Sequence, residues 1–347
     1  MRRRLPCVRG VVLNDGCVMS TAWVHDLDPY AIELWEGGPI RWYGLAYLAG
    51  FLVGFVLIRR VLRVGVSPLP PKSASELVFA LALGAVVGGR GGYIVFYQPS
   101  LLWTFSDELP FWNALAVNQG GMASHGGMIG VLVASAIFAR RRSVPFLHVL
   151  DLAAFAAPVG LFFGRIANFV NGELFGRPTA ETLPWAVKFP QEMYAWRGDE
   201  LSAVRARLAP LHAETSSIDG IVAAIPRGDD AIAAAVAPLL TSRHPSQLYE
   251  ALLEGSLVFV ALAALWRRPR KPGSIASAFA MIYAGVRIFG EQFRVPDAPL
   301  TSLGLVALTR GQALSVALLL GGVIVTVVSL RAKRPPAGGW SKIGASA

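Results

Sequence analysis

The sequence predicts an all-α polytopic membrane protein with seven transmembrane helices and a small extracytoplasmic cap domain between helices four and five. Hydrophobic residues make up 54% of the 347-residue chain, charged residues only 16%, and the mean hydropathy is +0.50. Soluble domains carry roughly 25% charged residues. Two further observations support this class: apolar runs of membrane-spanning length recur along the chain, and basic residues concentrate in alternate connections.

Seven apolar runs have the length of a membrane-spanning helix, because a bilayer core needs about 20 mostly apolar residues. The runs cover residues 42–62, 76–97, 122–140, 149–171, 247–266, 274–293 and 311–331. Several contain glycine or proline, which membrane helices tolerate. We therefore expect seven helices in this order along the chain.

Basic residues concentrate after the first, third, fifth and seventh runs. They are Arg59, Arg60, Arg63, Lys72, Arg140, Arg141, Arg142, Arg267, Arg268, Arg270, Lys271, Arg331, Lys333 and Arg334. Residues 98–121, after the second run, contain no lysine or arginine. The positive-inside rule then places the N-terminus outside and the C-terminus in the cytoplasm, which agrees with an odd number of spans.

The sequence predicts a membrane domain flanked by an N-terminal extension and a C-terminal tail. Residues 30–334 form the membrane domain, and its long loop 173–246 is expected to fold as an extracytoplasmic cap, because structureless loops of that length are uncommon. Residues 1–29 are an N-terminal extension outside the core. Its arginines contradict the topology, so either this charge is tolerated or the true start is Met19. We expect residues 335–347 to be a disordered cytoplasmic tail.

Composition argues against several classes of function. The net charge is +10, but the cations lie in short clusters between apolar runs, which is a poor pattern for binding nucleic acid. Cys7 and Cys17 form no CxxC pair and the five histidines are scattered, so we expect no metal site. No internal repeat is visible, which weakens the case for an inverted-repeat transporter.

Polar residues interrupt the stretch GLFFGRIANFVNGELFGRPT, residues 160–179. Arg165 and Asn168 are three residues apart and share a helix face, and Asn171 and Glu173 follow at the end of the run. A charged side chain at mid-bilayer costs about 2.5–3.5 kcal/mol on insertion scales, so it needs a partner or a function. The alternative is an interfacial anchor, in which Arg165 snorkels to the headgroups and Glu173 faces water.

A histidine and a helical stripe are the other candidates. His125 lies between two Gly-Gly pairs, and a neutral imidazole can accept a proton near pH 7; the alternative is a plain loop histidine. Tyr283, Arg287, Glu291 and Arg294 fall on one face of the sixth run. Arg287 and Glu291 can form a purely structural ion pair. Alternatively, Arg287 can join the arginine of the fourth run in holding a phosphate, whose oxygens match guanidinium donors.

The fifth run begins with SRHPSQLYEALLEG, where Ser246 can cap a helix that includes Glu250 and Glu254. The topology places all these groups toward the outer leaflet, where one shared cavity could hold an anionic amphiphile such as a phospholipid. Two rival interpretations stay open at this point. The chain could be a transporter or flippase for such an amphiphile, or a non-catalytic lipid-binding scaffold in which His125 is dispensable.

Five ordered stretches resemble the motifs of bacterial prolipoprotein diacylglyceryl transferases. They are IRWYGLAY, GGMASHGGMIG, GRIANFVNGELFGRPT, RHPSQLYEALLEG and RIFGEQFRVPDA. The resemblance covers about 30–335 and leaves out the first 24 or so residues and the alanine-rich part of the 173–246 loop, which looks longer than usual. It implies a multi-pass protein of the bacterial cell (inner, cytoplasmic) membrane.

The resemblance also implies the reaction. That family transfers the diacylglyceryl group of phosphatidylglycerol, in the outer leaflet, to the lipobox cysteine thiol of a preprolipoprotein, and the products are a thioether and glycerol 1-phosphate. It uses no metal or organic cofactor. The partners it implies are the lipid and the preprolipoprotein signal peptide, and we expect the chain to act as a monomer.

The residues that match the family's important positions divide into two groups. The expected catalytic residues are His125, Arg165 and Arg287. The expected substrate-binding residues are Tyr43, Asn168, Glu173, Gly176, Tyr283 and Glu291. Only a thiolate is a good nucleophile and a free thiol has a pKa of about 8.5, so His125 is the candidate base. Arg165 and Arg287 are the candidates to hold the charge of the phosphate leaving group. Cys7 and Cys17 match no motif, so we expect neither to be a covalent intermediate.

Overall fold

The computed structural model describes residues 22–32, 40–107, 109–117, 120–209, 217–295, 301–303 and 306–341. Cys7, Cys17 and Met19 lie outside these residues, so the expectations about them stay predictions. The described chain divides into two compact units. The smaller unit contains residues 178–244 and the segment up to Asp26. The larger unit contains residues 27–177 and the residues from 245 onward.

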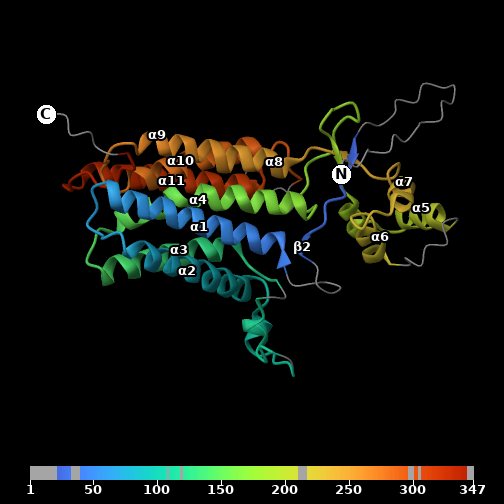
Figure 1. Ribbon diagram of the computed structural model, residues 1–347, viewed down its shortest axis with the longest axis horizontal. Helices are drawn as coiled ribbons and strands as arrows, with labels where there is room; N and C mark the ends of the chain where they lie inside the picture. Colours follow the sequence, from blue (N-terminus) through green and yellow to red (C-terminus); the bar gives the residue numbers. More distant parts are fainter. Residues whose placement is uncertain are drawn as a thin grey trace, which may run out of the picture. The chain divides into compact units, whose positions relative to one another are not determined.

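The larger unit consists of long helices packed side by side (Figure 1). They are α1 (Trp42–Val64), α2 (Ser73–Phe96), α3 (Ser124–Arg141), α4 (Phe146–Val170), α8 (Ser246–Glu250), α9 (Val258–Leu265), α10 (Ser274–Gly290) and α11 (Arg310–Arg331). The π-helical segment η6 (Ala251–Leu257) joins α8 to α9, so these three elements form one continuous rod. Each of the seven predicted apolar runs therefore contains one helical rod.

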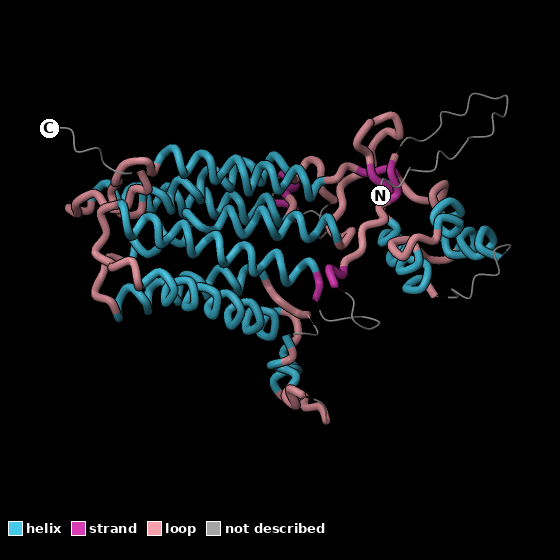
Figure 2. The backbone as a smooth tube through the Cα atoms, viewed as in Figure 1, coloured by secondary structure: helices cyan, strands magenta, loops and turns pink. Residues whose placement is uncertain are grey.

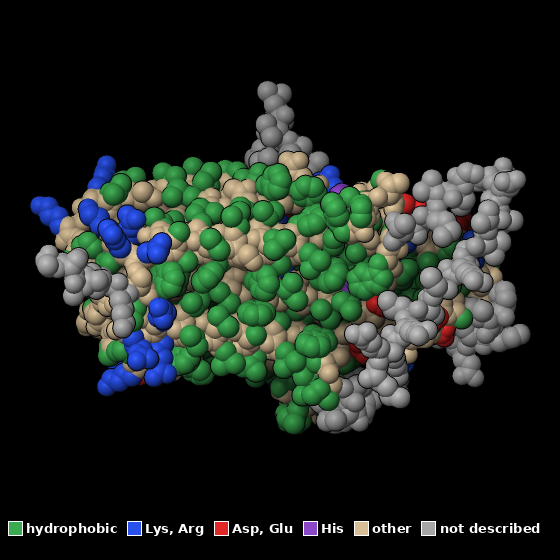
Figure 3. All heavy atoms as spheres, turned by 45° about the horizontal axis from the view of Figure 1, so that its top comes forward, with side chains coloured by type: hydrophobic (Ala, Val, Ile, Leu, Met, Phe, Trp, Pro, Cys, Tyr) green, Lys and Arg blue, Asp and Glu red, His purple; other side chains and the backbone are tan. Residues whose placement is uncertain are grey.

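Five of these rods are long and apolar enough to cross a membrane: Trp42–Val64, Ser73–Phe96, Phe146–Val170, Ser246–Leu265 and Gly311–Arg331. α10 is apolar but shorter, and α3 ends in Arg140 and Arg141, which lower its apolar content. The exposed side chains along the rods are mostly hydrophobic, and Lys and Arg gather at one end of this unit (Figure 3). The chain is thus a mostly helical polytopic membrane protein, while the number of seven spans stays a prediction.

The connections of this unit carry short elements, visible as strands and loops in Figure 2. β2 (Tyr30–Ile32) pairs with β3 (Ile40–Arg41), and β6 (Thr301–Leu303) pairs with β7 (Val306–Leu308), both antiparallel. The 3₁₀ helices η1 (Pro99–Leu102) and η2 (Asn113–Leu115) lie between α2 and α3. These elements shape the connections rather than adding a layer to the bundle.

A buried carboxylate fixes the start of α10 against α4. The Asp151 side chain of α4 accepts hydrogen bonds from the backbone N–H groups of Gly273 (2.7 Å), Ile275 (3.0 Å) and Ala276 (2.8 Å). The first N–H groups of a helix have no partner within the helix, so an acceptor from a neighbouring helix satisfies them. Asp151 thereby sets where α10 begins and how its polar stripe lies along α4.

The segment after α11 folds back onto the bundle. Gly338 pairs with Val66 in an isolated antiparallel bridge, and the indole Nε1 of Trp340 donates to the carbonyl of Ala263 at 2.7 Å. The backbone and the indole of residues 335–341 thus bond to the connection after α1 and to α9. The expected disordered tail stays a prediction for residues 342–347, which lie outside the described residues.

The smaller unit has its own sheet and apolar core. β1 (Trp23–Val24) runs parallel to β4 (Val187–Lys188), and β4 runs antiparallel to β5 (Ser242–Arg243). The 3₁₀ helix η4 (Pro190–Ala195) and the helices α5 (Asp199–Leu208), α6 (Ile218–Ala224) and α7 (Asp230–Val236) enclose a buried cluster around Met193. The segment before the membrane domain thus supplies one strand to this sheet.

Candidate active site

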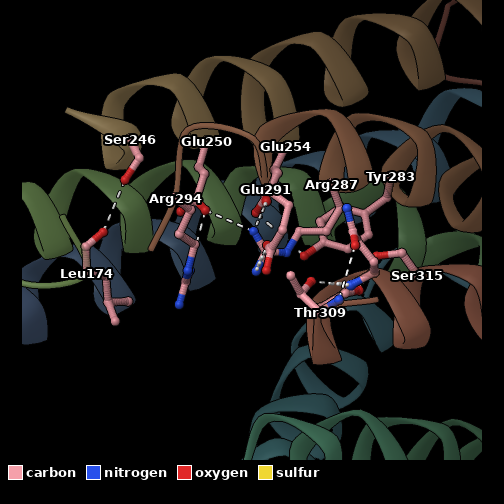
Figure 4. A network of polar contacts seen from close by, with 12 residues as sticks. Leu174, Ser246, Glu250, Glu254, Tyr283, Arg287, Glu291, Arg294, Thr309 and Ser315 are labelled. Atoms are coloured by element: carbon pink, nitrogen blue, oxygen red, sulfur yellow. Dashed lines mark hydrogen bonds and ion pairs between the residues drawn. The ribbon is translucent and has the colours of Figure 1, made fainter. Parts of the chain in front are cut away.

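Six charged side chains meet inside the larger unit, between α4, α8, η6 and the end of α10. All of them except the arginine of α4 are labelled in Figure 4. We call them the arginine–glutamate cluster; its members are Arg165, Glu250, Glu254, Arg287, Glu291 and Arg294. The exposed fraction of these side chains ranges from 1% for Glu250 and Glu254 to 14% for Arg165. Charged groups are so rarely buried among apolar helices that this cluster is a candidate for function.

Glu250 is the centre of the cluster because three arginines bind its carboxylate. Oε2 lies 3.0 Å from Arg165 Nη1, and Oε1 lies 2.9 Å from Arg287 Nη1 and 3.4 Å from Arg294 Nη1. These arginines come from α4, from α10 and from the turn after α10. One carboxylate of α8 therefore joins α4 to α10 and the turn that follows α10.

Glu254 also lies between the arginines of α4 and α10. Its Oε2 accepts from Arg165 Nη2 at 3.0 Å and from Arg165 Nε at 3.3 Å, and its Oε1 lies 3.5 Å from Arg287 Nη1. The hydroxyl of Tyr283 lies 3.5 Å from Oε2. The Oε1 atom is buried and has no hydrogen-bond partner among the described residues.

Glu291 holds the other side of the Arg287 guanidinium. Its Oε2 lies 3.1 Å from Arg287 Nη2, one helical turn along the chain. A Cβ atom added to Gly311, in the first turn of α11, would lie 3.0 Å from each Glu291 carboxylate oxygen. Glycine at this position therefore leaves the space that Glu291 occupies beside Arg287.

A π-helical turn brings the two central glutamates to α4. η6 starts directly after Glu250 and includes Glu254, and π-helical turns often occur at functional sites. A Cβ added to Gly255 would lie 2.6 Å from the Cβ of Phe162 and 2.8 Å from its Cα. Only a glycine allows η6 to approach α4 this closely, which is the approach that the contact between Glu254 and Arg165 needs.

A second polar group lies at the end of α4. The Asn168 Nδ2 atom donates to the Tyr43 hydroxyl at 2.7 Å and to Glu173 Oε1 at 2.9 Å. Gln247 Nε2 in turn donates to the Glu173 backbone carbonyl at 2.7 Å. Three predicted site residues thus meet here, Tyr43 from α1, Asn168 from α4 and Glu173 from the turn after α4, and Gln247 from α8 joins them.

The turn after α4 is tied to the turn after α10. Gly176 pairs with Arg294 in an isolated antiparallel bridge, and the Arg177 N–H donates to the Phe293 carbonyl at 2.8 Å. The ring of Phe293 packs edge-on against Tyr249 of α8, with 5.4 Å between the ring centroids. Gly176 therefore helps to place Arg294 beside Glu250.

His125 is the second residue of α3, and no hydrogen bond or ion pair joins it to the cluster among the described residues. α3 and α4 are joined by residues 142–145 and so run antiparallel. At 1.5 Å per residue, His125 lies about 24 Å and Arg165 about 28 Å from this connection, so both lie toward the same end of the bundle. The structure thus brings together eight of the nine predicted site residues in two groups and leaves His125 on the neighbouring helix.

The connection before α3 is held by a buried cation. Arg90 of α2 donates to four backbone carbonyls, those of Asn113 (2.5 Å), Ala114 (2.8 Å), Gly120 (2.7 Å) and Gly121 (3.1 Å). These bonds satisfy the guanidinium without a carboxylate. They fix the chain four residues before His125 and so define where α3 begins.

The structure adds three residues that the sequence prediction did not assign to the site. Glu250, Glu254 and Arg294 complete the cluster, and the formal charges of its three arginines and three glutamates cancel. Glu250 and Glu254 are two carboxylates at i, i+4 in an apolar run, a signal that sequence reasoning noted without using. The predicted pair of arginines is therefore not open to solvent but already bound to carboxylates.

The described residues contain no group of three or more His, Cys, Asp or Glu side chains that could hold a metal ion.

In the smaller unit, partial burial lowers the pKa of His244, two residues before α8. Burial and the Asp219 carboxylate raise the pKa of Tyr194. Both side chains are therefore uncharged at pH 7.

Comparison with known proteins assigns the chain to a family. The family profile described as prolipoprotein diacylglyceryl transferase matches residues 29–328. A phosphatidylglycerol–prolipoprotein diacylglyceryl transferase of Bdellovibrio bacteriovorus is 43% identical over 343 residues, which cover 92% of this chain and 97% of the relative. A relative with the same name from Rhodospirillum rubrum is 39% identical, over 88% of this chain and 94% of the relative. Another from Cereibacter sphaeroides is also 39% identical, over 91% of this chain and 99% of the relative. The chain therefore belongs to the prolipoprotein diacylglyceryl transferase family.

Proposed function

We propose that this protein is a phosphatidylglycerol–prolipoprotein diacylglyceryl transferase that carries out the first step of lipoprotein maturation. It transfers the diacylglyceryl group of phosphatidylglycerol to the lipobox cysteine thiol of a preprolipoprotein. Membership of the family and the names of relatives that match almost the whole chain support this activity. The observation in the structure that supports it most is the arginine–glutamate cluster, which places the guanidinium groups of Arg165 and Arg287 deep among apolar helices.

The reaction breaks one carbon–oxygen bond and forms one carbon–sulfur bond. The cysteine thiolate attacks the glyceryl carbon that carries the phosphate, and the bonding electrons leave with the phosphate oxygen as glycerol 1-phosphate. The thiol proton must be removed, because only the thiolate is a strong nucleophile. The leaving phosphate needs cations to hold its charge rather than a strong acid.

We assign these tasks to the residues at the same end of the bundle. His125 removes the thiol proton, and Arg165 and Arg287 hold the phosphate oxygens through their fork of N–H donors. Glu291 orients Arg287 at 3.1 Å, and Tyr283 donates a hydrogen bond inside the cluster. A chain of hydrogen bonds at the end of α4 joins Tyr43, Asn168 and Glu173, and Gly176 lies in the turn after α4. We assign substrate binding to these four residues.

We further propose the orientation that the basic residues indicate. The chain spans the bacterial inner membrane seven times and acts as a monomer, with the N-terminus outside and the C-terminus in the cytoplasm. Lys and Arg gather at the end of the larger unit that would face the cytoplasm (Figure 3). The site then draws its lipid from the outer leaflet, and residues 173–246 form an extracytoplasmic cap.

The direct test is an assay with purified full-length protein, phosphatidylglycerol and a synthetic lipobox peptide. We expect release of glycerol 1-phosphate and a peptide whose mass increases by one diacylglyceryl group. The double variant Cys7→Ser with Cys17→Ser should keep this activity, since neither cysteine is a covalent intermediate. Well-folded wild-type protein that releases no glycerol 1-phosphate would overturn the proposed function.

A further inference from the structure

The two arginines assigned to the phosphate are bridged by the protein's own carboxylates. Arg165 from α4 and Arg287 from α10 both contact Glu250, at 3.0 and 2.9 Å, and both contact Glu254, at 3.0 and 3.5 Å. Figure 4 shows Arg287 with the two glutamates. A phosphate that bonds to both guanidinium groups must lie between them. The two glutamates already occupy that position.

An entering phospholipid also changes the charge of the cluster. The three arginines and three glutamates cancel, whereas a phosphodiester brings one negative charge. A buried charge without a partner is unfavourable in an apolar interior. One carboxylate must therefore lose its charge when the anionic headgroup binds, and the simplest way is uptake of a proton from water.

The contacts single out Glu254 for this role. Glu250 is bound by three arginines, one of them Arg294 from the turn after α10, so its neutralisation would remove the central contact of the whole cluster. Glu291 contacts Arg287 but not Arg165, so its neutralisation frees only one of the pair. Neutralising Glu254 frees donors on both arginines.

The surroundings of Glu254 allow it to give up a contact. Its contact with Arg287, at 3.5 Å, is the longest ion pair in the cluster. Its Oε1 is buried and accepts no hydrogen bond from the described residues, as is also the case for Oε2 of Glu250 and of Glu291. The charged and titratable groups that face it are Arg165 from α4, Glu250 from α8, and Tyr283 and Arg287 from α10.

We propose, on the basis of the function proposed above, that Glu254 holds the place of the substrate phosphate and takes up a proton when the phosphatidylglycerol headgroup displaces it from Arg165 and Arg287. The proton comes from water and binds the Glu254 carboxylate. The headgroup then takes over the guanidinium donors that Glu254 releases. Glu250 stays charged and keeps the three arginines in place during the exchange.

The test counts protons during lipid binding. Full-length protein in phosphatidylcholine nanodiscs is titrated with short-chain phosphatidylglycerol in a calorimeter, in two buffers of different ionisation enthalpy. A phosphodiester does not titrate near neutral pH, so any proton that is taken up belongs to the protein. For the wild type we expect uptake of about one proton per lipid and a Kd that weakens about tenfold per pH unit above neutrality.

The variant Glu254→Gln should bind the lipid without proton uptake and with a Kd that does not change with pH. Glu192→Gln is the matched control: Glu192 is also buried beside an arginine, with Oε2 2.6 Å from Arg243 Nε, but it lies in the smaller unit. It should keep the proton uptake of the wild type. Wild-type binding without proton uptake, or the same uptake in Glu254→Gln, would overturn the proposal.

A measurement on the wild type alone covers the case in which Glu254→Gln does not fold. The infrared difference spectrum on lipid addition should gain a band of a protonated carboxyl group, and a spectrum without it contradicts the proposal. The peptide assay separates this inference from the proposed function. Diacylglyceryl transfer without proton uptake overturns the role of Glu254 alone, whereas proton-coupled lipid binding without any thioether overturns the function.

Discussion

Glu250→Gln should destabilise the protein more than any exposed ion-pair variant, because it removes the charge that three arginines share. Two unit charges about 4 Å apart attract by about 4 kcal/mol at an effective dielectric constant of 20. Glu250 makes three such contacts and is 1% exposed. Much of this attraction only offsets the loss of hydration, but removing one partner leaves buried charges uncompensated, which costs about 3–5 kcal/mol.

The assay is unfolding of the purified protein in mixed micelles by a denaturing detergent, followed by helical circular dichroism. Glu76→Gln is the control, because Glu76 pairs with Arg142 at the surface and is 51% exposed. An exposed pair contributes about 0–1 kcal/mol. The reasoning is refuted if Glu250→Gln unfolds at the same detergent fraction as Glu76→Gln.

Three further variants test single contacts. Gly255→Ala adds a Cβ that would lie 2.6 Å from the Phe162 Cβ, so it should move η6 away from α4 and slow diacylglyceryl transfer about 100-fold. Gly285→Ala is the control, because there is open space around Gly285, and it should keep the wild-type rate. Equal transfer rates in the two variants would contradict this reasoning. His125→Gln should lower turnover about 10²–10⁴-fold and leave lipid binding unchanged, so an equal loss of both would indicate a structural histidine. Asp151→Ala removes the acceptor of three N–H groups and should lower stability by about 2 kcal/mol in the same detergent titration, which unchanged stability would contradict.

The positions of the helices could be predicted from the sequence because an apolar run of about 20 residues is a strong local signal. The run 42–62 became α1 at Trp42–Val64, and the run 311–331 became α11 at Arg310–Arg331. Local signals did not reveal that residues 22–26 join the sheet of the smaller unit, or that residues 335–341 fold back. Both depend on pairing between segments that are distant in the sequence.

The site was predictable only in part for the same reason. The stripe Tyr283, Arg287 and Glu291 lies on one helix, so its spacing alone showed that these groups share a face. The partner of Arg165 is Glu254, 89 residues later, and no periodicity connects two helices that far apart. Sequence reasoning therefore found the possible pair of Arg287 with Glu291, which lie on one helix, but not that Glu250 and Glu254 bind both Arg165 and Arg287.

The transfer rate of Arg287→Ala is the most direct test of the claim that the arginine–glutamate cluster is the active site. Arg142→Ala, at the exposed pair with Glu76, is the control, and both variants are compared with the wild type in the assay with phosphatidylglycerol and a lipobox peptide. We expect Arg142→Ala to release glycerol 1-phosphate at the wild-type rate and Arg287→Ala to lose at least about 100-fold, the loss seen when one stabilising donor is removed. A folded Arg287→Ala protein that keeps the wild-type rate would contradict the claim.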